Sequence, residues 1–432
     1  MGSHAGNEQF RISKRASQTI EIASPFLVHI QAVLGNPFDP LTNPEGIVNL
    51  GIAENKLCED LMVEKMKSVQ AIEESPCLLY YDVNSGTASA KKSAKRFIDN
   101  FLNPITEIDE KNIVIMSGLT SSLETLAFAI ADSGEYIMVP SPYYFRIRND
   151  IQDRAEVNVL NVPLQYKTDH KPSMCEMNSE ILEEYYQKAI SENKVVRGIL
   201  LSNPNNPSGD VLTEDQLLDI LEFANRHNLH VIANEIYALS VFDPEITFKS
   251  LLSLPLPNPN MVHFTWGSSK DLGLSGFRIS MVYTKNPNVL SYCLSVSAFT
   301  TASRLIQHRL QEIIDDKDWL SKVFLPTKFS RMQKRYQEIT SQLRQHGARV
   351  HTSGATMFIW LDLREFLQEP TFDAENSLFL KFMSEKVFVV PGKELYNQDP
   401  GMFRIVFTLD EPVIKEGIRR VIKVLQDCRR QL

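Results

Sequence analysis

A lysine and an arginine eight residues apart mark the segment GSSKDLGLSGFR, residues 267–278. Lys270 follows an apolar run of strand length, and Arg278 ends this segment, which contains three glycines. A lysine amine at the end of a buried strand can join a carbonyl group covalently and carry a proton, and a nearby arginine can hold an anion. Taken alone, such a segment is more often a surface loop with solvated charges, so its interpretation depends on other motifs.

Three more motifs accompany this segment in a defined order. The chain carries NPNNPSG at 203–209 and ANEIY at 233–237, each at the end of a strand-like run, and DPGMFRIVF at 399–407. Together the four segments resemble the fold type I aminotransferase family, which uses pyridoxal 5′-phosphate. Four motifs in the family's order are far more specific than any one of them.

Two further strings narrow the resemblance. NPFDPLTNPEGIVNLGIAENKL at 36–57 and PSPYY at 140–144 are similar to the 1-aminocyclopropane-1-carboxylate (ACC) synthase branch, and most of all to animal ACC-synthase-like proteins, some of which are regarded as inactive. The resemblance covers roughly residues 35–425. It implies a homodimer with two sites at its interface and, as a small-molecule substrate, an amino acid of unknown identity.

The resemblance also implies roles for the residues around the cofactor. Lys270 would form the Schiff base with the cofactor aldehyde and then move the Cα proton of a substrate. Tyr144 would stack on the pyridine ring, with Tyr143 as the register alternative. The cofactor phosphate would be held by Arg278, by the hydroxyls of Ser268 and Ser269, and by backbone N–H groups of Gly118, Leu119 and Thr120 at a helix N-terminus.

Four more residues are assigned by the resemblance to the cofactor's ring and to the substrate. Asn206 and Tyr237 would hydrogen-bond the phenolic oxygen of the cofactor. Arg404 would bind the substrate α-carboxylate, and Glu54 matches a position near the cationic end of the substrate in ACC synthases. Each has an ordinary alternative: a turn for the asparagine, a core position for the tyrosine, a rim charge for the arginine and a helix cap for the glutamate.

Three departures from the family pattern bear on activity. Asn234 stands where the family has an aspartate that keeps the pyridine nitrogen protonated. An ion pair at about 4 Å is worth roughly 4 kcal/mol at an effective dielectric of about 20, so its loss would slow carbanion chemistry by as much as roughly a thousandfold. Gly267 replaces a phosphate-binding serine, and Asn84 replaces a tyrosine that is lent to the partner's phosphate and that lies near the sulfonium substrate of true ACC synthases.

Two functions therefore stay open. The first is a protein that binds pyridoxal phosphate, with weak or altered amino-acid chemistry (Cα deprotonation, elimination or transamination) and no efficient ACC synthesis. The second is a catalytically inactive pseudoenzyme with a binding or regulatory role. Whether the chain is an enzyme is not decided by its motifs, because Lys270 and Arg278 are retained while Asn234 departs.

Buried strands are needed to position these residues, and the chain supplies them between amphipathic stretches. Strand followed by helix, repeatedly, indicates an α/β fold with a mostly parallel sheet between helices, and the resemblance implies seven strands. Strands are predicted at 112–116, 136–140, 198–202, 230–234 and 262–266. Helices are predicted at 120–131, 180–190 and 213–227, several with a Ser or Thr N-cap followed by an acidic residue, and a surface loop is predicted at 168–180.

The regular alternation of predicted strands and helices ends at about residue 325. A long charged helix at 328–345, strands at 356–363, 387–392 and 403–407, and a closing helix at 413–426 predict a smaller α+β domain. We divide the chain into an N-terminal segment, 20–75, that packs with this small domain, a large cofactor-binding domain, 76–325, and the small domain itself, 326–432.

Composition excludes several other classes of protein. The net charge of −8 is the wrong sign for a nucleic-acid binder, and no apolar run approaches the length of a membrane span. The five scattered cysteines and a start without an apolar signal region favour a reducing, cytoplasmic location. No nucleotide-binding glycine motif follows a strand. His227 and His230 have metal-compatible spacing, but with no carboxylate or cysteine partner apparent we predict no metal site.

Overall fold

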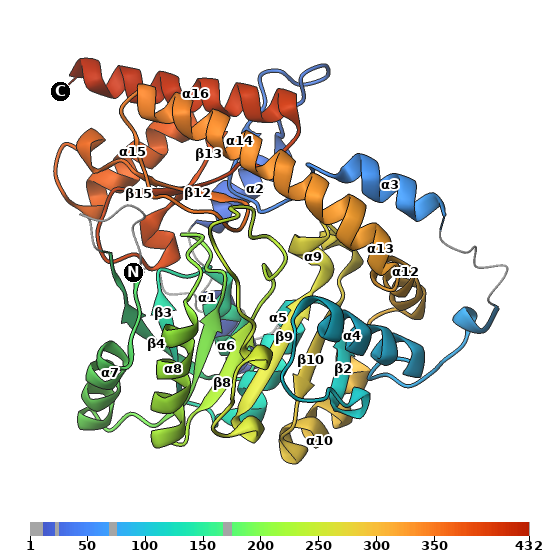
Figure 1. Cartoon of the computed structure of the whole chain (residues 1–432). Helices are drawn as coiled ribbons and strands as arrows, with labels where there is room; N and C mark the ends of the chain where they lie inside the picture. The colour runs from blue at the N-terminus through green and yellow to red at the C-terminus, as the bar shows by residue number, and fades with distance from the viewer. Residues whose placement is uncertain (1–11, 22–25, 69–75, 167–174, 432) are drawn as a thin grey trace.

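The computed structural model describes residues 12–21, 26–68, 76–166 and 175–431. Two sheets lie one above the other in Figure 1, a large one at the bottom and a smaller one at the top, and α14 (Leu325–Gln345) crosses from one to the other. Within the described residues, no helix is long and apolar enough to cross a membrane.

The large sheet has seven strands in the order β2-β10-β9-β8-β7-β3-β4. Only β10 runs antiparallel to its neighbours, and because β2 and β9 both pair antiparallel with it, the other six strands share one direction. Their carboxyl ends meet at one edge of the sheet. The bounds are β2 Ile113–Met116, β3 Tyr136–Ser141, β4 Asn158–Pro163, β7 Val196–Ser202, β8 His230–Asn234, β9 Val262–Gly267 and β10 Ser280–Thr284.

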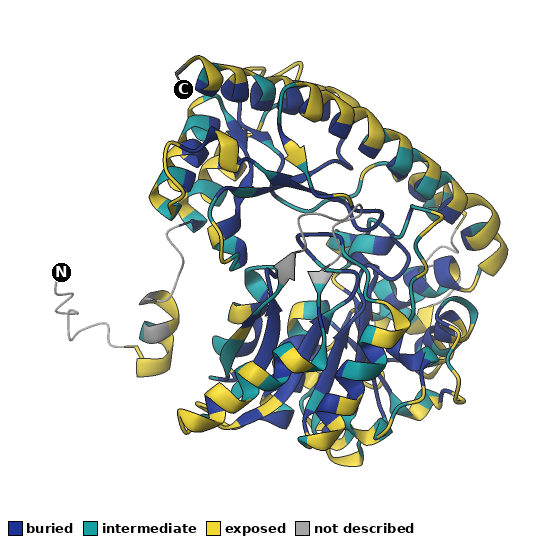
Figure 2. Ribbon diagram, turned by 60° about the vertical axis from the view of Figure 1, so that its left-hand side comes forward, coloured by how far each residue is buried: buried dark blue, intermediate teal, exposed yellow. Residues whose placement is uncertain are grey.

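Helices cover both faces of this sheet, so its strands bury side chains on both faces. Along β2, Ile113 and Ile115 point into the core on one face, and Val114 and Met116 point into the core on the other. Figure 2 shows the buried strands in dark blue between helices whose outer sides are exposed. The helices are α4 Ala88–Phe101, α5 Leu119–Ile130, α6 Arg146–Gln152, α7 Ser179–Ser191, α8 Glu214–Arg226, α9 Ser268–Asp271, α10 Pro287–Ser295, α11 Ser297–Thr300, α12 Arg304–Ile314 and α13 Lys317–Trp319.

The small sheet is antiparallel, in the order β11-β12-β15-β14, and packs against α14 and two other long helices. A second, parallel pair joins Val48 of β1 to Val387 of β13, so the N-terminal part of the chain enters this unit. The bounds are β1 Val48–Asn49, β11 Arg349–Val350, β12 Phe358–Asp362, β13 Val387–Phe388, β14 Val390–Pro391, β15 Met402–Val406, α15 Phe372–Ser384 and α16 Glu411–Gln431. Near the N-terminus lie α1 Lys14–Glu21, α2 Leu27–Gly35 and α3 Glu59–Lys67, and a small hairpin pairs β5 Gln165–Tyr166 with β6 Cys175–Glu176.

The predicted strands and helices are confirmed, with ends that shift by a few residues. The predicted helix at 213–227 is α8, where the Thr213 side chain accepts from the backbone N–H of Gln216 and closes a capping box. The predicted strand at 387–392 is wrong in one respect, because it divides into β13 and β14. The strands β4 and β10 were not predicted. Neither shows a continuous apolar run, because β4 is only half-buried and β10 mixes polar with apolar residues.

The predicted surface loop at 168–180 is mostly outside the described residues, which resume at Cys175. The described part forms the end of the small hairpin and the start of α7. The described part of residues 20–75 packs against both sheets. Phe26 and Val48 lie in the apolar cluster of the small sheet, and Met62 lies in a cluster of the large one. The three domain boundaries stay a proposal, which the pairing of β1 with β13 supports.

Candidate active site

Five segments that follow strands at the carboxyl edge of the large sheet each carry a predicted site residue. In open α/β sheets this edge is where ligands bind. The segments follow β2, β3, β7, β8 and β9, and the carboxyl ends of these strands share one side because the strands share one direction. The residues they present are Gly118, Tyr144, Asn206, Tyr237 and Lys270.

Lys270 lies in the short helix α9, directly after β9. Its Nζ donates a hydrogen bond to the backbone oxygen of Ala53, at 2.7 Å. Burial lowers the pKa of the Lys270 amine to about 8, and Glu54 counteracts this while Arg404 and Arg278 add to it. An amine with this pKa has a substantial unprotonated fraction near neutral pH, as a nucleophile requires.

Arg404 is a fully buried cation in β15 of the small sheet. Its Nη2 donates to the backbone oxygen of Gly51 at 2.6 Å, and its Nη1 donates to Oδ1 of Asn206 at 2.8 Å. The guanidinium carbon lies 4.4 Å from the centre of the Phe358 ring. Burial lowers the pKa of Arg404 to about 10, so the side chain stays charged at neutral pH. Among the described residues its Nε has no hydrogen-bond partner, so one donor of a buried cation is free.

Tyr237 and Tyr144 lie in the surroundings of Arg404. Burial raises the pKa of the Tyr237 phenol well above its usual range, although Arg404 and a hydrogen bond with Asn206 counteract this. Burial also raises the pKa of the Tyr144 phenol, against the positive charge of Arg404. Both phenols are therefore protonated at neutral pH and can act as donors.

The structure separates the two candidates for the stacking tyrosine. The Tyr143 hydroxyl donates to Oδ1 of Asn161 at 2.8 Å, and its ring stacks on Tyr396 with centres 4.6 Å apart. Tyr143 is thus a packed core residue. Tyr144 is buried, and the positive charges of Arg404 and Arg278 counteract the rise in the pKa of its phenol, so it stays the candidate for stacking on the cofactor ring.

The predicted phosphate-binding residues form a cradle at the start of α5. Gly118 caps this helix with φ at +81°, and a Cβ built there would clash with the guanidinium of Arg278. The Ser268 hydroxyl is buried and has no hydrogen-bond partner among the described residues. A backbone that admits only glycine, an adjacent guanidinium and an unpartnered buried hydroxyl suit a bound anion.

Asp150 of α6 lies beside Thr120, and no sequence motif pointed to it. Its Oδ2 accepts a hydrogen bond from Thr120 Oγ1 at 3.3 Å, and Arg146 Nη2 lies 3.4 Å from its Oδ1. Burial raises the pKa of Asp150 to about 6. Thr120 therefore already donates its hydroxyl to a carboxylate. Leu119 is the first residue of α5, and the buried Ser269 precedes Lys270 in α9.

Glu54 follows Ala53, whose backbone oxygen accepts the hydrogen bond of Lys270 Nζ. Both of its carboxylate oxygens accept from Ser275 Oγ, at 2.7 and 3.0 Å. Its backbone oxygen accepts from Thr408 Oγ1 at 2.7 Å. Glu54 is the anion that raises the pKa of Lys270, against the effect of burial.

Asn234 ends β8 and is almost fully buried. Its Nδ2 donates to Ser202 Oγ at 3.1 Å, and its Oδ1 accepts from the backbone N–H of Ile236 at 3.4 Å. The adjacent carboxylate of Glu235 does not take over the role of an aspartate here, because it accepts from the backbone N–H of Leu251 at 2.8 Å, and burial raises its pKa to about 8. The residue at this strand end is neutral.

The other two departures from the family pattern, Gly267 and Asn84, differ in their exposure to solvent. A Cβ on Gly267 would meet the backbone oxygen of Ile279 at 3.0 Å, so the strand pairing leaves little room for a side chain. Asn84 is exposed, and its backbone oxygen accepts from Thr301 Oγ1 at 2.9 Å. In the described part of the chain, no hydrogen bond or ion pair joins Asn84 to Lys270 or Arg278.

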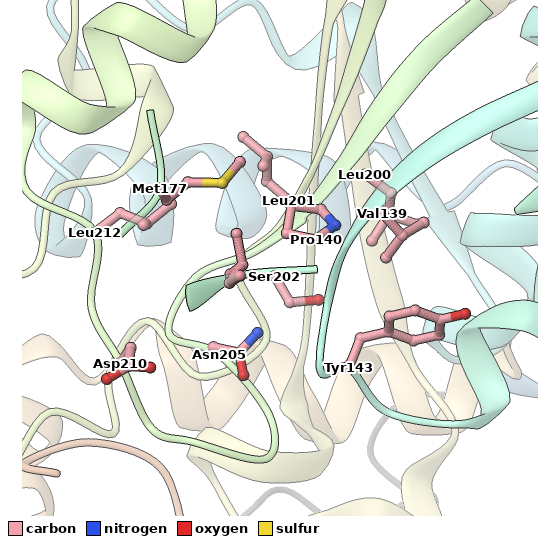
Figure 3. Close-up of a pocket in the computed structure, with 11 residues that line it drawn as sticks. Val139, Pro140, Tyr143, Met177, Leu200, Leu201, Ser202, Asn205, Asp210 and Leu212 are labelled. Carbon is pink, nitrogen blue, oxygen red and sulfur yellow. The ribbon is translucent and has the colours of Figure 1, made fainter. Parts of the chain in front are cut away.

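Two cavities lie near the site. The smaller, about 30 Å³, is lined by Tyr143, Ser202 and Asp210 among others (Figure 3) and has the size of a single water. The larger, about 530 Å³, adjoins Glu54 and lies between α3 and the loop of residues 272–277. Only the larger one has room for an organic ligand.

The two histidines with metal-compatible spacing face different partners. His227 Nε2 lies 2.7 Å from Oε2 of Glu183, a carboxylate that the sequence did not reveal, and His230 Nδ1 lies 2.8 Å from Nε2 of His263. Over the described ranges, no group of three or more His, Cys, Asp or Glu side chains gathers as metal ligands. The four cysteines whose side chains are described are free thiols.

Comparisons with known proteins place this geometry in a family. The family model for aminotransferase class I and II matches residues 45–421. The ACC synthase-like protein 1 of Mus musculus is 35% identical over 391 residues, which cover 90% of this chain and 78% of that protein. The "probable inactive 1-aminocyclopropane-1-carboxylate synthase-like protein 2" of Homo sapiens is 36% identical over 394 residues, 90% of this chain and 69% of that protein. The ACC synthase of Nicotiana tabacum is 32% identical over 412 residues, covering 92% and 83%.

Solved structures agree on the fold. The aspartate aminotransferase of Rhizobium meliloti superimposes with a TM-score of 0.80 at 19% identity, covering 96% of this chain and 99% of that one. A Thermus thermophilus aspartate aminotransferase superimposes with a TM-score of 0.77 at 16% identity, covering 96% and 100%. At these identities the likeness concerns the fold, and it matches the seven-stranded α/β sheet with its smaller companion unit.

Proposed function

Because the chain belongs to the class I and II aminotransferase family, in its ACC synthase-like branch, we propose that it binds pyridoxal 5′-phosphate at Lys270 and acts slowly on an amino acid. The observation that carries the proposal is the buried Lys270 amine, with a pKa lowered to about 8, at the carboxyl edge of the sheet. When bound, the cofactor supplies an aldehyde for covalent attachment and an electron-withdrawing ring.

The residues at the start of α5 suit the cofactor's phosphate. Arg278 supplies a positive charge beside Gly118, and the free hydroxyl of Ser268 supplies a donor that has no other partner among the described residues. The backbone N–H groups at the start of α5 favour a negative charge. Thr120 contributes its backbone rather than its hydroxyl, which is engaged by Asp150.

Arg404 is proposed to bind the substrate carboxylate. Its guanidinium is held by the Gly51 carbonyl and by Asn206, and it retains an unpartnered Nε within the described structure. A charged, planar donor group in a buried position binds a carboxylate strongly. Lys270 then holds or moves the substrate Cα proton, and Tyr237 and Asn206 orient the cofactor's phenolic oxygen through donated hydrogen bonds.

Asn234 is the reason to propose slow or altered chemistry. Its amide can donate to a ring nitrogen but cannot hold a proton there by charge, and Glu235 is turned toward Leu251. Stabilisation of negative charge on the substrate is therefore weaker than with an aspartate. We do not propose efficient ACC synthesis, because Asn84 also departs from the branch.

A pseudoenzyme with a binding or regulatory role is the second candidate. It is favoured by the combination of Asn234, Gly267 and Asn84, and by similarity to a human protein whose name calls it inactive. The two candidates differ in turnover and not in cofactor binding. Replacing Asn234 by Asp separates them, because only a chain with an otherwise competent site would gain activity.

The working unit is proposed to be a homodimer in the cytoplasm. A segment at the large sheet exposes apolar side chains and is fixed to α12 by Arg304, whose Nη1 donates to the backbone oxygens of Cys77 and Tyr80 at 2.6 and 2.7 Å. Apolar side chains that are held in place yet exposed suit a surface that a second copy covers. These side chains are Leu79, Tyr80, Tyr81, Val83 and the neighbouring Phe299.

An absorbance titration tests the proposed function. Purified protein mixed with pyridoxal phosphate should develop a visible band of bound cofactor, and Lys270→Ala should lack it. Lys285→Ala, which removes a half-buried lysine after β10, is the matched control and should keep the band. A wild-type protein without any band would remove the proposal.

A further inference from the structure

We propose that Lys328 and Asp271 are positioning residues: a buried cation and a buried carboxylate that fix the Lys270 turn against the segment carrying Tyr237. The inference rests on the proposed function of Lys270. It concerns two residues to which the motif comparison assigns no role, although Asp271 lies within the segment 267–278, and it is built from contacts within the chain.

Asp271 follows Lys270 in α9 and is completely buried. Its Oδ1 accepts from Ser240 Oγ at 2.6 Å. Its Oδ2 accepts from the backbone N–H of Leu239 at 3.0 Å and from Nε1 of Trp266 at 2.9 Å. The carboxylate therefore binds α9 to the segment after β8 and to β9, with three donors holding it.

Lys328 approaches the same place from the first turns of α14 and is also completely buried. Its Nζ donates to the backbone oxygens of Leu239 at 2.6 Å and of Asp271 at 2.9 Å. Ser240 Oγ lies 3.3 Å from the same nitrogen. All three donors of the ammonium group thus have an oxygen partner, as a buried cation requires.

The network joins the two groups that would touch the cofactor from different strands. The backbone N–H of Ser240 donates to the backbone oxygen of Tyr237 at 2.9 Å, so the segment that Asp271 and Lys328 hold is the turn that presents the Tyr237 phenol. Asp271 itself is one residue from Lys270. A shift of this pair would therefore move the amine relative to the phenol.

The pair also reaches the site electrostatically. The negative charge of Asp271 helps to raise the pKa of Tyr237, and Lys328 in turn counteracts the raised pKa of Asp271. Without the positive charge of Lys328, the negative charge of Asp271 would act on the site unopposed. A positive charge on the Lys270 nitrogen that carries the cofactor would then be stabilised, and its pKa would rise. Removing the Asp271 charge would do the opposite.

The position of Lys328 gives the network a second consequence. Leu325 of α14 packs in an apolar cluster of the large sheet, whereas Met332, two turns on, packs in the cluster of the small sheet. Lys328 is located between them. The helix that connects the two sheets is therefore anchored directly to the Lys270 turn.

The test measures the pH midpoint of the bound cofactor's visible band, together with the melting temperature, in four variants of the full chain. We expect Lys328→Met to raise the midpoint by about one pH unit and Asp271→Asn to lower it by a similar amount. The double variant should return close to the wild type in midpoint while melting at a lower temperature. Lys322→Met, at an exposed lysine six residues earlier, is the control and should change neither.

Ser240→Ala keeps the test decisive if the buried substitutions prevent folding. It removes the 2.6 Å hydrogen bond to Asp271 without changing the charge, and we expect a smaller shift of the midpoint than a charge removal causes. Unchanged midpoints in all folded variants, with lowered melting temperatures, would assign the network a purely structural role and overturn the inference. A wild type without a band would overturn the proposed function as well, so the two failures are distinguishable.

Discussion

Arg404 Nη1 donates a hydrogen bond to Asn206 Oδ1 at 2.8 Å, and this contact joins the small sheet to the large one. Arg404 comes from β15, and Asn206 comes from the loop after β7, 198 positions earlier in the chain. One partner is proposed to bind the substrate carboxylate and the other to hold the cofactor's phenolic oxygen. The contact therefore connects the proposed substrate-binding residue to a proposed cofactor-binding residue.

Arg404→Lys should weaken amino-acid binding while leaving the cofactor in place. Lysine keeps the positive charge but cannot donate to Gly51, Asn206 and a carboxylate with a planar group. We expect at least a tenfold loss of amino-acid affinity, about 1.4 kcal/mol, measured as the amino-acid concentration that changes the spectrum of the bound cofactor. Arg419→Lys, at an exposed arginine of α16, is the control, and equal affinities of the two variants would contradict the role.

Asn234→Asp should accelerate Cα chemistry. A carboxylate at this strand end supplies the charge that Asn234 lacks, and the gain is bounded by roughly a thousandfold. Single-turnover decay of the cofactor spectrum with an excess of amino acid measures it. Asn225→Asp, which makes the same change of charge on the exposed side of α8, should have no effect. If Asn234→Asp is as slow as the wild type, the neutral residue is not what limits the reaction.

Gly118→Ala should impair cofactor binding for a local reason. The added Cβ would meet the Arg278 guanidinium, and the backbone has φ at +81°. Gly134→Ala is a matched control, because Gly134 has φ at +86° and nothing within 4 Å of the position of a Cβ. Both variants carry the backbone strain, but only Gly118→Ala should lose cofactor affinity, by about tenfold or more. Equal affinities would show that the start of α5 does not hold the phosphate.

The reactivity of Lys270 should follow its lowered pKa. Only the unprotonated amine attacks the aldehyde, so the rate of cofactor attachment to the cofactor-free protein should rise with pH and level off above about 8. Because Glu54 raises the pKa of Lys270, Glu54→Gln should move the plateau to lower pH. A rate that continues to rise toward the ordinary lysine pKa of 10.5 would show that the amine is not buried as described.

Tyr81→Asp should weaken the proposed dimer. Tyr81 is fully exposed in the single chain, next to exposed Tyr80 and Leu79. A carboxylate buried in an interface would lack a partner and disfavour association. Sedimentation across a range of concentrations measures the monomer fraction. Leu41→Asp, at another exposed apolar residue, is the control, and dimers of equal stability would place the interface elsewhere.

The sequence identified the strand ends because each motif follows an apolar run that is buried on both faces. Lys270, Tyr237 and Asn206 could be predicted on one edge for this reason, since parallel strands present their carboxyl ends together. The sequence predicts Tyr144 with Tyr143 as the register alternative, because adjacent aromatic residues differ only in orientation. The stacking of Tyr143 on Tyr396 supports the choice of Tyr144.

The buried charges could not be predicted. Lys328 belongs to a helix whose many charged residues indicate an exposed face, and only the fold shows that this one ammonium group is enclosed by backbone oxygens of Leu239 and Asp271. Asp150 lies in a segment with no motif. In both cases the residue type shows that the side chain is charged, but the partners of that side chain lie in distant segments that only the fold brings together.

The identity of the lysine that carries the cofactor tests the central claim most directly. Wild-type protein loaded with pyridoxal phosphate is reduced with borohydride, digested and mapped by mass spectrometry. We predict that the added mass is found on the peptide that contains Lys270, in close to one copy per chain. A modification spread over exposed lysines, or located on a different single lysine, would contradict the account.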